Sequence, residues 1–377
     1  MNHFTRFAVG LDTSDREMHI VVLEPGGALF HETALPLDAG VLSIYFRDLS
    51  ELDPVIAVET GTHANWIYDL LKSLGFADVI VADARKLKMI SQSDKKSDRR
   101  DAQTLAKFVQ SCPELLHPVQ PRGEQARQDR RLLGARQVCV ETRTKLIAHV
   151  RGVVKSAGGR LPSCDAANFP GLAGALPDSL KEILTPVLEI IRQINGTISR
   201  FDEQIKQRCK NDPIIERLTQ VAQVGPITGL AFAATVEDPK RFRRNRAIAS
   251  FLGLRPKLDQ SGEIDKQLPI TKAGDGYMRQ LLVISAQGTL RKNSPPSDLK
   301  RWGLAIARSG GKRGKRRAAV AVARKLAVLL LSLWKSGADY EPLRAQASKD
   351  APRPKRITRS SKPVPPQRKS SRLRKAA

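Results

Sequence analysis

The chain has 377 residues, of which 41% are apolar, so it is long enough for two or three domains with a sizeable hydrophobic core. Lysine and arginine number 64 against 38 aspartate and glutamate residues, which gives a formal net charge of +26 and a pI near 10.3. Such an excess indicates a polyanionic partner, above all nucleic acid. Because only 5% of the residues are aromatic, phosphate contacts rather than base stacking should carry most of the affinity.

The composition also excludes several classes of protein. No two of the four cysteines are spaced as CxxC, so they predict reduced thiols rather than a zinc site or a disulfide framework. The most apolar stretch, residues 326–334, is too short to cross a bilayer, and no long apolar region follows Met1 as in a signal peptide. These features predict a soluble cytoplasmic protein that associates with the nucleoid and not with a membrane.

Residues 1–115 alternate strand-like and helix-like segments, which predicts a mixed α/β domain. Three short strands joined by turns come first, and a fourth strand, a helix and a fifth strand follow. The predicted strands cover residues 6–12, 18–24, 28–35, 55–59 and 78–82, and the predicted helices cover residues 63–75, 84–92 and 98–110.

Four acidic residues are the strongest functional signal in this domain. Asp12 and Glu59 each end an apolar run, while Asp98 and Asp101 are three apart and would share one face of a helix. Carboxylate oxygens suit Mg²⁺ or Mn²⁺, and several carboxylates in one site need cations to neutralise them. Two carboxylates on adjacent strands with a pair on a nearby helix are typical of RNase H-like phosphoryl-transfer sites. Taken singly, Asp12 could be a turn residue, Glu59 an arginine partner and Asp98 a helix N-cap.

Residues 120–210 predict two long helices around a loop at 158–177 that contains glycine and proline. Apolar residues of the second helix have alternating spacings of four and three, as in a coiled coil. They are Leu180, Leu184, Val187, Ile191, Ile194, Ile198, Phe201 and Ile205. Pro186 either breaks this helix or, after Thr185, starts it. The pattern predicts an antiparallel hairpin within one subunit or an arm for oligomerisation.

Residues 213–340 predict a third, mainly α-helical domain. Its first part, residues 218–229, resembles a helix-hairpin-helix, in which the turn amides and the following helix N-terminus can hold a phosphate. Gln223 stands where glycine is usual at the first turn position, which weakens the case for phosphate binding by the turn itself. An ordinary helix–turn–helix connection explains the same residues.

Ser261 is the candidate nucleophile of this third domain. It precedes Gly262 in a segment that we expect to be a polar loop between helices, with lysines and arginines on both sides. A serine exposed among phosphate-binding cations could attack a DNA phosphate. The residue types alone, however, favour a plain turn serine.

The end of the chain, residues 345–377, predicts a disordered basic tail. Residues 349–375 contain 11 lysines and arginines and a single acid, Asp350, interrupted by proline and serine. Such a segment would bind a phosphate backbone without reading its sequence, or would only aid solubility.

Together these motifs resemble the DEDD transposases of the insertion-sequence one-hundred-and-ten family, the bridge-RNA-guided recombinases. The resemblance covers residues 6–336, and two separate domains match in the right order. Ser97 stands where threonine is commoner in the family. The matching motifs are Asp12, Glu59, Lys96-Ser97-Asp98-Arg99-Arg100-Asp101-Ala102, Val224-Gly225-Pro226, and Ser261-Gly262 followed by Ile270-Thr271-Lys272-Ala273-Gly274.

This resemblance implies an RNase H-like (resolvase-like) N-terminal domain, a coiled-coil arm and a serine-bearing transposase domain. It implies that Ser261 attacks the DNA phosphate and forms a transient phosphoserine. The implied ligands of Mg²⁺ or Mn²⁺ are Asp12, Glu59, Asp98 and Asp101. The implied partners are donor DNA, target DNA, a structured guide RNA that pairs with both, and further copies of the chain in a dimer or tetramer with composite sites.

Three other functions compete with this one. A junction-resolving endonuclease would use the same metal site without a covalent serine step, and a non-catalytic nucleic-acid-binding protein would use neither. Residues 10–14 and 59–62 also resemble, faintly, the phosphate loops of actin-like sugar kinases. Such a kinase has no use for a net charge of +26 or for the motif at residues 96–102.

Overall fold

A computed structural model describes residues 5–84, 86, 97–261, 264–309 and 311–344. The chain divides into two compact units, Met1–Leu132 and Leu133–Ala377, and the boundary falls inside one long helix. The tail predicted at residues 345–377 and most of the helix predicted at 84–92 lie outside the described residues. The predicted third domain and residues 133–210 of the predicted arm fall in the second unit, while residues 120–132 of the arm fall in the first.

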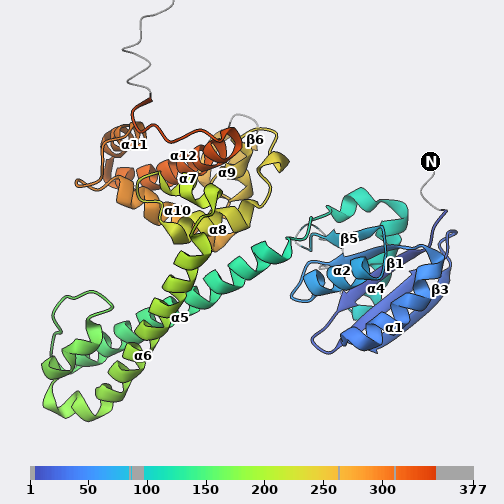
Figure 1. The fold of residues 1–377 in the computed structure, drawn as a ribbon, viewed down its shortest axis with the longest axis horizontal. Helices are drawn as coiled ribbons and strands as arrows, with labels where there is room; N and C mark the ends of the chain where they lie inside the picture. Colours follow the sequence, from blue (N-terminus) through green and yellow to red (C-terminus); the bar gives the residue numbers. More distant parts are fainter. Residues whose placement is uncertain (1–4, 85, 87–96, 262–263, 310, 345–377) are drawn as a thin grey trace, which may run out of the picture. The chain divides into compact units, whose positions relative to one another are not determined.

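Unit 1 is built on a mixed sheet with the strand order β3-β2-β1-β4-β5 (Figure 1). The first three strands pair antiparallel, whereas β4 pairs parallel with β1 and with β5. This arrangement fits the RNase H-like class, and all five predicted strands are confirmed. The elements are β1 (Ala8–Thr13), β2 (Glu17–Leu23), β3 (Leu29–Pro36), α1 (Ala39–Leu49), η1 (Ser50–Leu52), β4 (Val55–Glu59), α2 (Ala64–Ser73), β5 (Val79–Ala82), α4 (Asp98–Ser111) and η2 (Pro113–Leu116).

Helices cover both faces of the sheet. Alternate residues of β1 point to opposite faces, so Val9 and Leu11 face α1 and α2, while Ala8, Gly10 and Asp12 face α4. The face under α1 and α2 carries large apolar side chains, whereas the face under α4 is lined mostly by small ones. The small side chains let α4 approach the sheet closely. The first turn of α4 therefore lies near the ends of β1 and β4 that carry Asp12 and Glu59.

Helix α1 is missing from the sequence-based prediction, although its signals are present. Asp38 caps it by accepting hydrogen bonds from the N–H groups of Gly40 and Val41. Its buried residues Leu42, Phe46 and Leu49 follow the spacing of one helical face.

Unit 2 begins with two long helices, α5 (Glu124–Ser156) and α6 (Asp178–Cys209), joined through η3 (Phe169–Ala175) (Figure 1). They run antiparallel, because Arg143 on α5 donates to Asn195 on α6, and Val150 packs with Leu188. Of the two predicted alternatives, the antiparallel hairpin within one subunit is therefore observed. Helix α6 is continuous through Pro186, so the proline neither breaks nor starts it.

Only half of the predicted coiled-coil positions of α6 are fully buried. Leu184, Ile191, Ile198 and Ile205, which are seven apart, form the buried set. Leu188 is buried in place of its predicted neighbour Val187. This shift turns the other apolar stripe of α6 toward solvent, where Ile183 is 66% and Ile190 is 47% exposed.

The rest of unit 2 packs around α12 (Gly314–Ser336), which contacts α7, α9, α10 and α11 (Figure 1). The most apolar stretch of the sequence is thus the central helix of a core. No helix in the described ranges is both long and apolar enough to cross a membrane. The remaining elements are α7 (Pro213–Thr219), α8 (Pro226–Val236), η4 (Pro239–Arg241), α9 (Ala247–Phe251), β6 (Pro256–Ser261), β7 (Ile264–Ile270), α10 (Gly276–Thr289), α11 (Asp298–Ser309) and η5 (Gly311–Arg313).

Candidate functional site

The carboxylates of Asp12 and Glu59 lie on neighbouring parallel strands. Leu11 of β1 pairs with Val58 of β4, and the next residue of each strand is Asp12 and Glu59, respectively. Gly10 and Ala57 both face α4, and Asp12 and Glu59 lie two residues after them. Because alternate residues of a strand point to the same face, both acids project from the face of the sheet that α4 covers. The parallel strand pair thus places two predicted site residues side by side.

Helix α4 carries Asp98 and Asp101 in its first turn, and Gly10 allows this helix to lie close to β1. A Cβ atom at Gly10 would lie 1.9 Å from the carbonyl oxygen of Ala102 and 2.5 Å from the backbone nitrogen of Ala106. No side chain fits in this space, so the backbones of β1 and α4 are in direct contact. The contact lies two residues from Asp12 and one from Asp101, and it fixes how far these carboxylates are apart.

Replacement of Gly10 by alanine is therefore expected to destabilise unit 1 by about 1–3 kcal/mol and to displace α4. The atoms in the way belong to backbone, so no side-chain rotation relieves the clash. Urea unfolding measures the stability, and strand-exchange activity should fall with it. Gly26→Ala is the matched control, because nothing lies within 4 Å of its Cβ position. Equal stability of the two variants would contradict the close contact.

The first turn of α4 carries Asp98 and Asp101, and neither of them is the N-cap. Ser97 is the N-cap, with extended backbone, and its hydroxyl accepts a hydrogen bond from the N–H of Arg100 at 3.4 Å. Asp98 is the first helical residue, so the alternative that it caps the helix is wrong. Serine and threonine both cap helices well, so Ser97 can cap α4 as the threonine that is commoner in the family would. Asp101 is 6% exposed and lies one turn further on.

The four acids interact electrostatically. Burial, followed by the carboxylates of Asp98, Asp101 and Glu59, raises the pKa of Asp12 to about 6. A backbone hydrogen bond from Thr13 opposes this shift only in part. The structure therefore brings the four acids that the sequence singled out within electrostatic range of one another.

The side chains are not at coordination distance from one another. No set of three or more His, Cys, Asp or Glu in the part of the chain that the structure describes is close enough to hold one ion. Electrostatic coupling acts over several ångströms, whereas ligands of Mg²⁺ lie about 2.1 Å from the ion. The donor set consists of hard carboxylate oxygens, and burial, followed by the other three acids, raises the pKa of Asp12, so the set fits a divalent cation.

His19 is a site residue that the sequence did not reveal. It pairs with Asp12 across β1 and β2, and its Nε2 lies 4.0 Å from Oδ2 of Asp98. A single histidine in an alternating strand has no local signature, and only the strand register brings it here. Its imidazole can contact either the acid cluster or a phosphate bound beside it.

Ser261 lies at the end of a strand and not in a loop. It is the last residue of β6 and pairs with Ile264 of β7, so residues 256–270 form a β-hairpin between α9 and α10. The loop prediction is wrong because the segment is rich in polar residues and lacks the apolar alternation of a half-buried strand.

Backbone contacts fix the base of this hairpin. Gly253 has a φ of +65°, and a Cβ atom there would lie 2.2 Å from the carbonyl oxygen of Ala273. The guanidinium of Arg279 donates hydrogen bonds to the carbonyl oxygens of Leu252 at 3.0 Å and Ala273 at 2.8 Å. These contacts join the two ends of the hairpin to α10, so the base is rigidly placed.

A basic surface lies next to this base. Arg241 stacks on Phe251, at 5.1 Å from the ring centroid, and Phe251 in turn contacts Gly274 at the hairpin's end. The cations of this surface are exposed, and none makes an ion pair with any described residue. We call them the basic surface: Arg241, Arg243, Arg244, Arg246, Arg255, Lys257 and Lys272.

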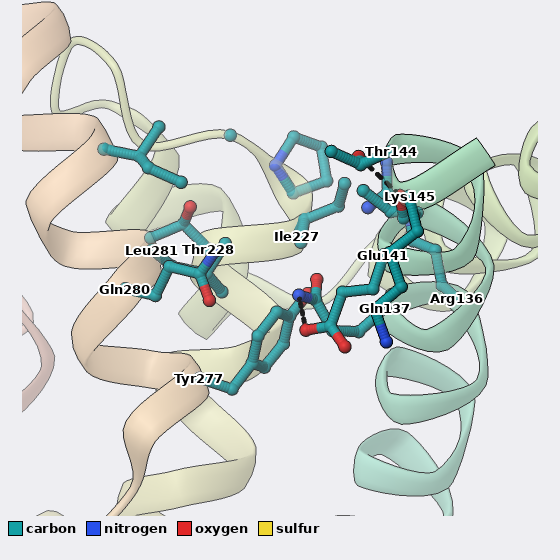
Figure 2. A pocket seen from close by; sticks show the side chains of 14 residues that line it. Arg136, Gln137, Glu141, Thr144, Lys145, Ile227, Thr228, Tyr277, Gln280 and Leu281 are labelled. Carbon is teal, nitrogen blue, oxygen red and sulfur yellow. Dashed lines mark hydrogen bonds between the residues drawn. The ribbon is translucent and has the colours of Figure 1, made fainter. Parts of the chain in front are cut away.

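The predicted helix-hairpin-helix corresponds to α7, a turn and α8. Gln223 adopts a φ of +72°, the left-handed conformation that the usual glycine would take. The turn is followed by Gly225 and Pro226, which start α8. A cavity of about 600 Å³ opens at this helix start, between α5, α8 and α10 (Figure 2).

Comparison with known proteins is consistent over both units. A model of the transposase IS116/IS110/IS902 family matches residues 215–300, and a model of a transposase of the IS110 DEDD type matches residues 9–158. A probable family 20 transposase of Pseudomonas aeruginosa is 29% identical over 311 residues, which are 79% of this chain and 88% of that protein. The transposase for insertion sequence element IS1111A of Coxiella burnetii is 27% identical over 290 residues, 74% of this chain and 77% of that protein.

The two family models match separate parts of the chain in the order that the sequence motifs predicted. The match over residues 9–158 covers the sheet with its acids, and the match over residues 215–300 covers α8, the strands β6 and β7, and α10. The chain belongs to the IS110 family of transposases.

Proposed function

We propose that this transposase cuts and rejoins donor and target DNA with two groups: the four-carboxylate cluster of unit 1 and Ser261 of unit 2. The observation that carries this proposal is the convergence of Asp12, Glu59, Asp98 and Asp101 from three elements, where burial, followed by repulsion from the other three carboxylates, raises the pKa of Asp12 to about 6. Carboxylates that only aid solubility would avoid one another.

Asp12, Glu59, Asp98 and Asp101 would hold Mg²⁺ or Mn²⁺. When bound, the metal supplies positive charge that stabilises the phosphate during displacement. The protein contributes the position of the carboxylates. Gly10 sets the distance between β1 and α4, and Ser97 caps the helix so that Asp98 is free to face the site.

Ser261 would act as the nucleophile. Its Oγ forms a bond to the phosphorus of one DNA strand, the ester bond to the leaving strand breaks, and the serine proton ends on the released hydroxyl. Reversal with a different strand end rejoins the DNA and frees the serine.

The acids and the serine would meet between subunits of a homo-oligomer. The exposed Ile183 and Ile190, one heptad apart on α6, support helix pairing between copies of the chain. A structured RNA would supply target choice by base pairing, while the protein reads backbone and shape. The net charge of +26 supports both nucleic-acid partners.

The test is a strand-exchange reaction with purified protein, donor DNA, target DNA, the noncoding RNA that flanks the gene, and Mg²⁺. We expect recombined product that requires all five components. Cleavage of branched DNA without the RNA and without a covalent intermediate would instead indicate a junction-resolving endonuclease. Binding without any cleavage would indicate a non-catalytic nucleic-acid-binding protein.

Neutralising the basic surface should reduce the salt dependence of DNA binding. Arg243→Gln, Arg244→Gln and Arg246→Gln together should lower the slope of log Kd against log salt by about 0.9 for each arginine that contacts a duplex phosphate. Fluorescence anisotropy at several salt concentrations measures the slope. The control removes three exposed cations of the helical hairpin, Lys155, Arg192 and Lys210. A similar fall in both triple variants would show that only total charge matters.

A further inference from the structure

Strand β3 is an open edge of the sheet in unit 1. It pairs with β2 on one side, and no strand in the part of the chain that the structure describes pairs with its other side (Figure 1). Alternate backbone N–H and C=O groups along its eight residues therefore point away from the sheet. Lysine and proline commonly protect such edges, but β3 contains no lysine, and its one proline, Pro36, is its last residue. The edge can thus accept a further strand.

Helix α1 extends this edge with an apolar surface. Tyr45 of α1 stacks on His31 of β3, with ring centroids 6.1 Å apart. Val41 lies one turn before Tyr45, and Ile44 is three residues after Val41, so both continue the same side of the helix toward solvent. Ile44 is 67% exposed, and Phe30 at the start of β3 is 50% exposed. We call the open side of β3 and these residues the edge surface: Leu29, Phe30, His31, Val41, Ile44 and Tyr45.

The edge surface has an acidic rim. Residues 24–52 contain five acids and a single base, Arg47, although the whole chain has a net charge of +26. Glu32 of β3 is already paired with Arg99, at 2.8 Å between Oε1 and Nε. The other four acids are exposed, and none makes an ion pair with a residue that the structure describes: Glu24, Asp38, Asp48 and Glu51. Such a rim repels nucleic acid and fits a basic, partly apolar polypeptide.

The chain itself contains a segment of that kind beyond residue 344, the last that the structure describes. Residues 355–362 lie between two prolines, and their eight residues equal the length of β3. A strand of this length has no proline at a ladder position. The segment carries four cations and the β-branched pair Ile357 and Thr358, which favours an extended conformation. The proline-free residues 367–377 contain no β-branched residue, so they fit the edge less well.

We propose that residues 355–362 pair with β3 as a sixth strand and cover the edge surface. Because the side chains of a strand alternate, Ile357 would lie between Lys355 and Arg359 on one face. Ile357 would pack on the apolar side chains of α1, and the two cations would reach the acids near the ends of that helix. While it is docked, the segment keeps its four cations away from nucleic acid. The pairing does not depend on the proposed function, because neither the four-carboxylate cluster nor Ser261 takes part.

Hydrogen exchange of β3 in the full chain, without nucleic acid, tests this pairing. Mass spectrometry of peptides that contain residues 29–36 measures it. Thr358→Pro removes an N–H and blocks pairing without a change of charge. It should speed exchange of the β3 amides that point away from β2 at least about tenfold, which corresponds to about 1.4 kcal/mol of docking free energy. Ser370→Pro, a proline in the same tail but outside the segment, is the matched control and should leave exchange unchanged.

Two further variants test the edge surface and its rim. Ile44→Ser should also speed exchange at β3, because it removes apolar area that the segment covers. Its control is Val138→Ser on α5, where the apolar side chain is similarly exposed, at 63%. Asp48→Lys should act in the same direction by repelling the cations of the segment. Its control is Glu114→Lys, at an exposed acid of η2, which contacts β5 at the opposite edge of the sheet.

Three results would overturn the pairing. If β3 of Thr358→Pro exchanges like that of Ser370→Pro, residues 355–362 do not occupy the edge. If β3 stays protected in Thr358→Pro and the protection grows with protein concentration, a second copy of the chain pairs edge to edge instead. If Ile44→Ser and Asp48→Lys have no more effect than their controls, α1 and its acids do not hold the segment. Strand-exchange activity is not measured in any of these comparisons, so the proposed function stands or falls separately.

Discussion

Replacing Asp12 by asparagine should abolish strand exchange and at the same time stabilise the metal-free protein. Activity should fall at least about a hundredfold, since residues that merely support metal ligands are already worth 10- to 100-fold. Stability should rise because the variant removes a buried charge that three neighbouring carboxylates repel. With solvent screening of this half-buried group taken into account, the gain in unfolding free energy is on the order of 1–2 kcal/mol near neutral pH.

The gain should depend on pH in a defined direction. The pKa of Asp12 is about 6 in the folded protein, above its ordinary value of 3.8. Between these values the folded state binds more protons than the unfolded state, so wild-type stability falls as pH rises. The loss of stability caused by the ionised Asp12 carboxylate is fully present above about pH 6 and absent below about pH 4. The advantage of Asp12→Asn over the wild type should follow the same course.

Urea unfolding in EDTA at pH 4, 6 and 7.5 measures this advantage. Asp15→Asn is the control, because Asp15 is exposed and outside the cluster. Added Mg²⁺ should then raise the melting temperature of the wild type and have little effect on Asp12→Asn, since a ligand stabilises only the state that binds it. A variant that is less stable than the wild type at pH 7.5 would show that the four carboxylates do not repel one another in the folded protein.

The sheet of unit 1 was predictable because its sequence signals are local. Apolar strands of the right length alternate with turns, and Asp12 and Glu59 end two of those strands. Parallel neighbours end at the same edge of a sheet, so the pairing of these acids also follows from the sequence. The prediction that Asp98 and Asp101 join them came from the family resemblance and the helical spacing.

The features that the sequence did not reveal depend on tertiary contacts. The need for glycine at position 10 follows from its contact with the backbone of Ala102, which lies far away in the sequence. The position of His19 beside the acids follows from the register of β1 and β2. The polar β-hairpin around Ser261 has no apolar pattern, so its pairing could not be read from composition.

The second large effect is expected for Ser261→Ala. If the serine is the nucleophile, its loss should reduce strand exchange by on the order of 10⁴-fold or more, as for other enzymes that lose a nucleophilic hydroxyl. DNA binding and its salt slope should not change, because the substitution removes no charge. Ser250→Ala, at an exposed serine of α9 in the same unit, should recombine normally.

The covalent intermediate separates a serine mechanism from direct hydrolysis. Wild-type protein should form a DNA adduct that survives SDS, and Ser261→Ala should form none. Asp98→Asn should also be inactive, but through loss of the metal site. If Ser261→Ala recombines normally while Asp98→Asn is inactive, the carboxylates alone perform the chemistry and the phosphoserine mechanism is wrong. If both variants are inactive and only the wild type forms the adduct, the two units contribute separate halves of one active site.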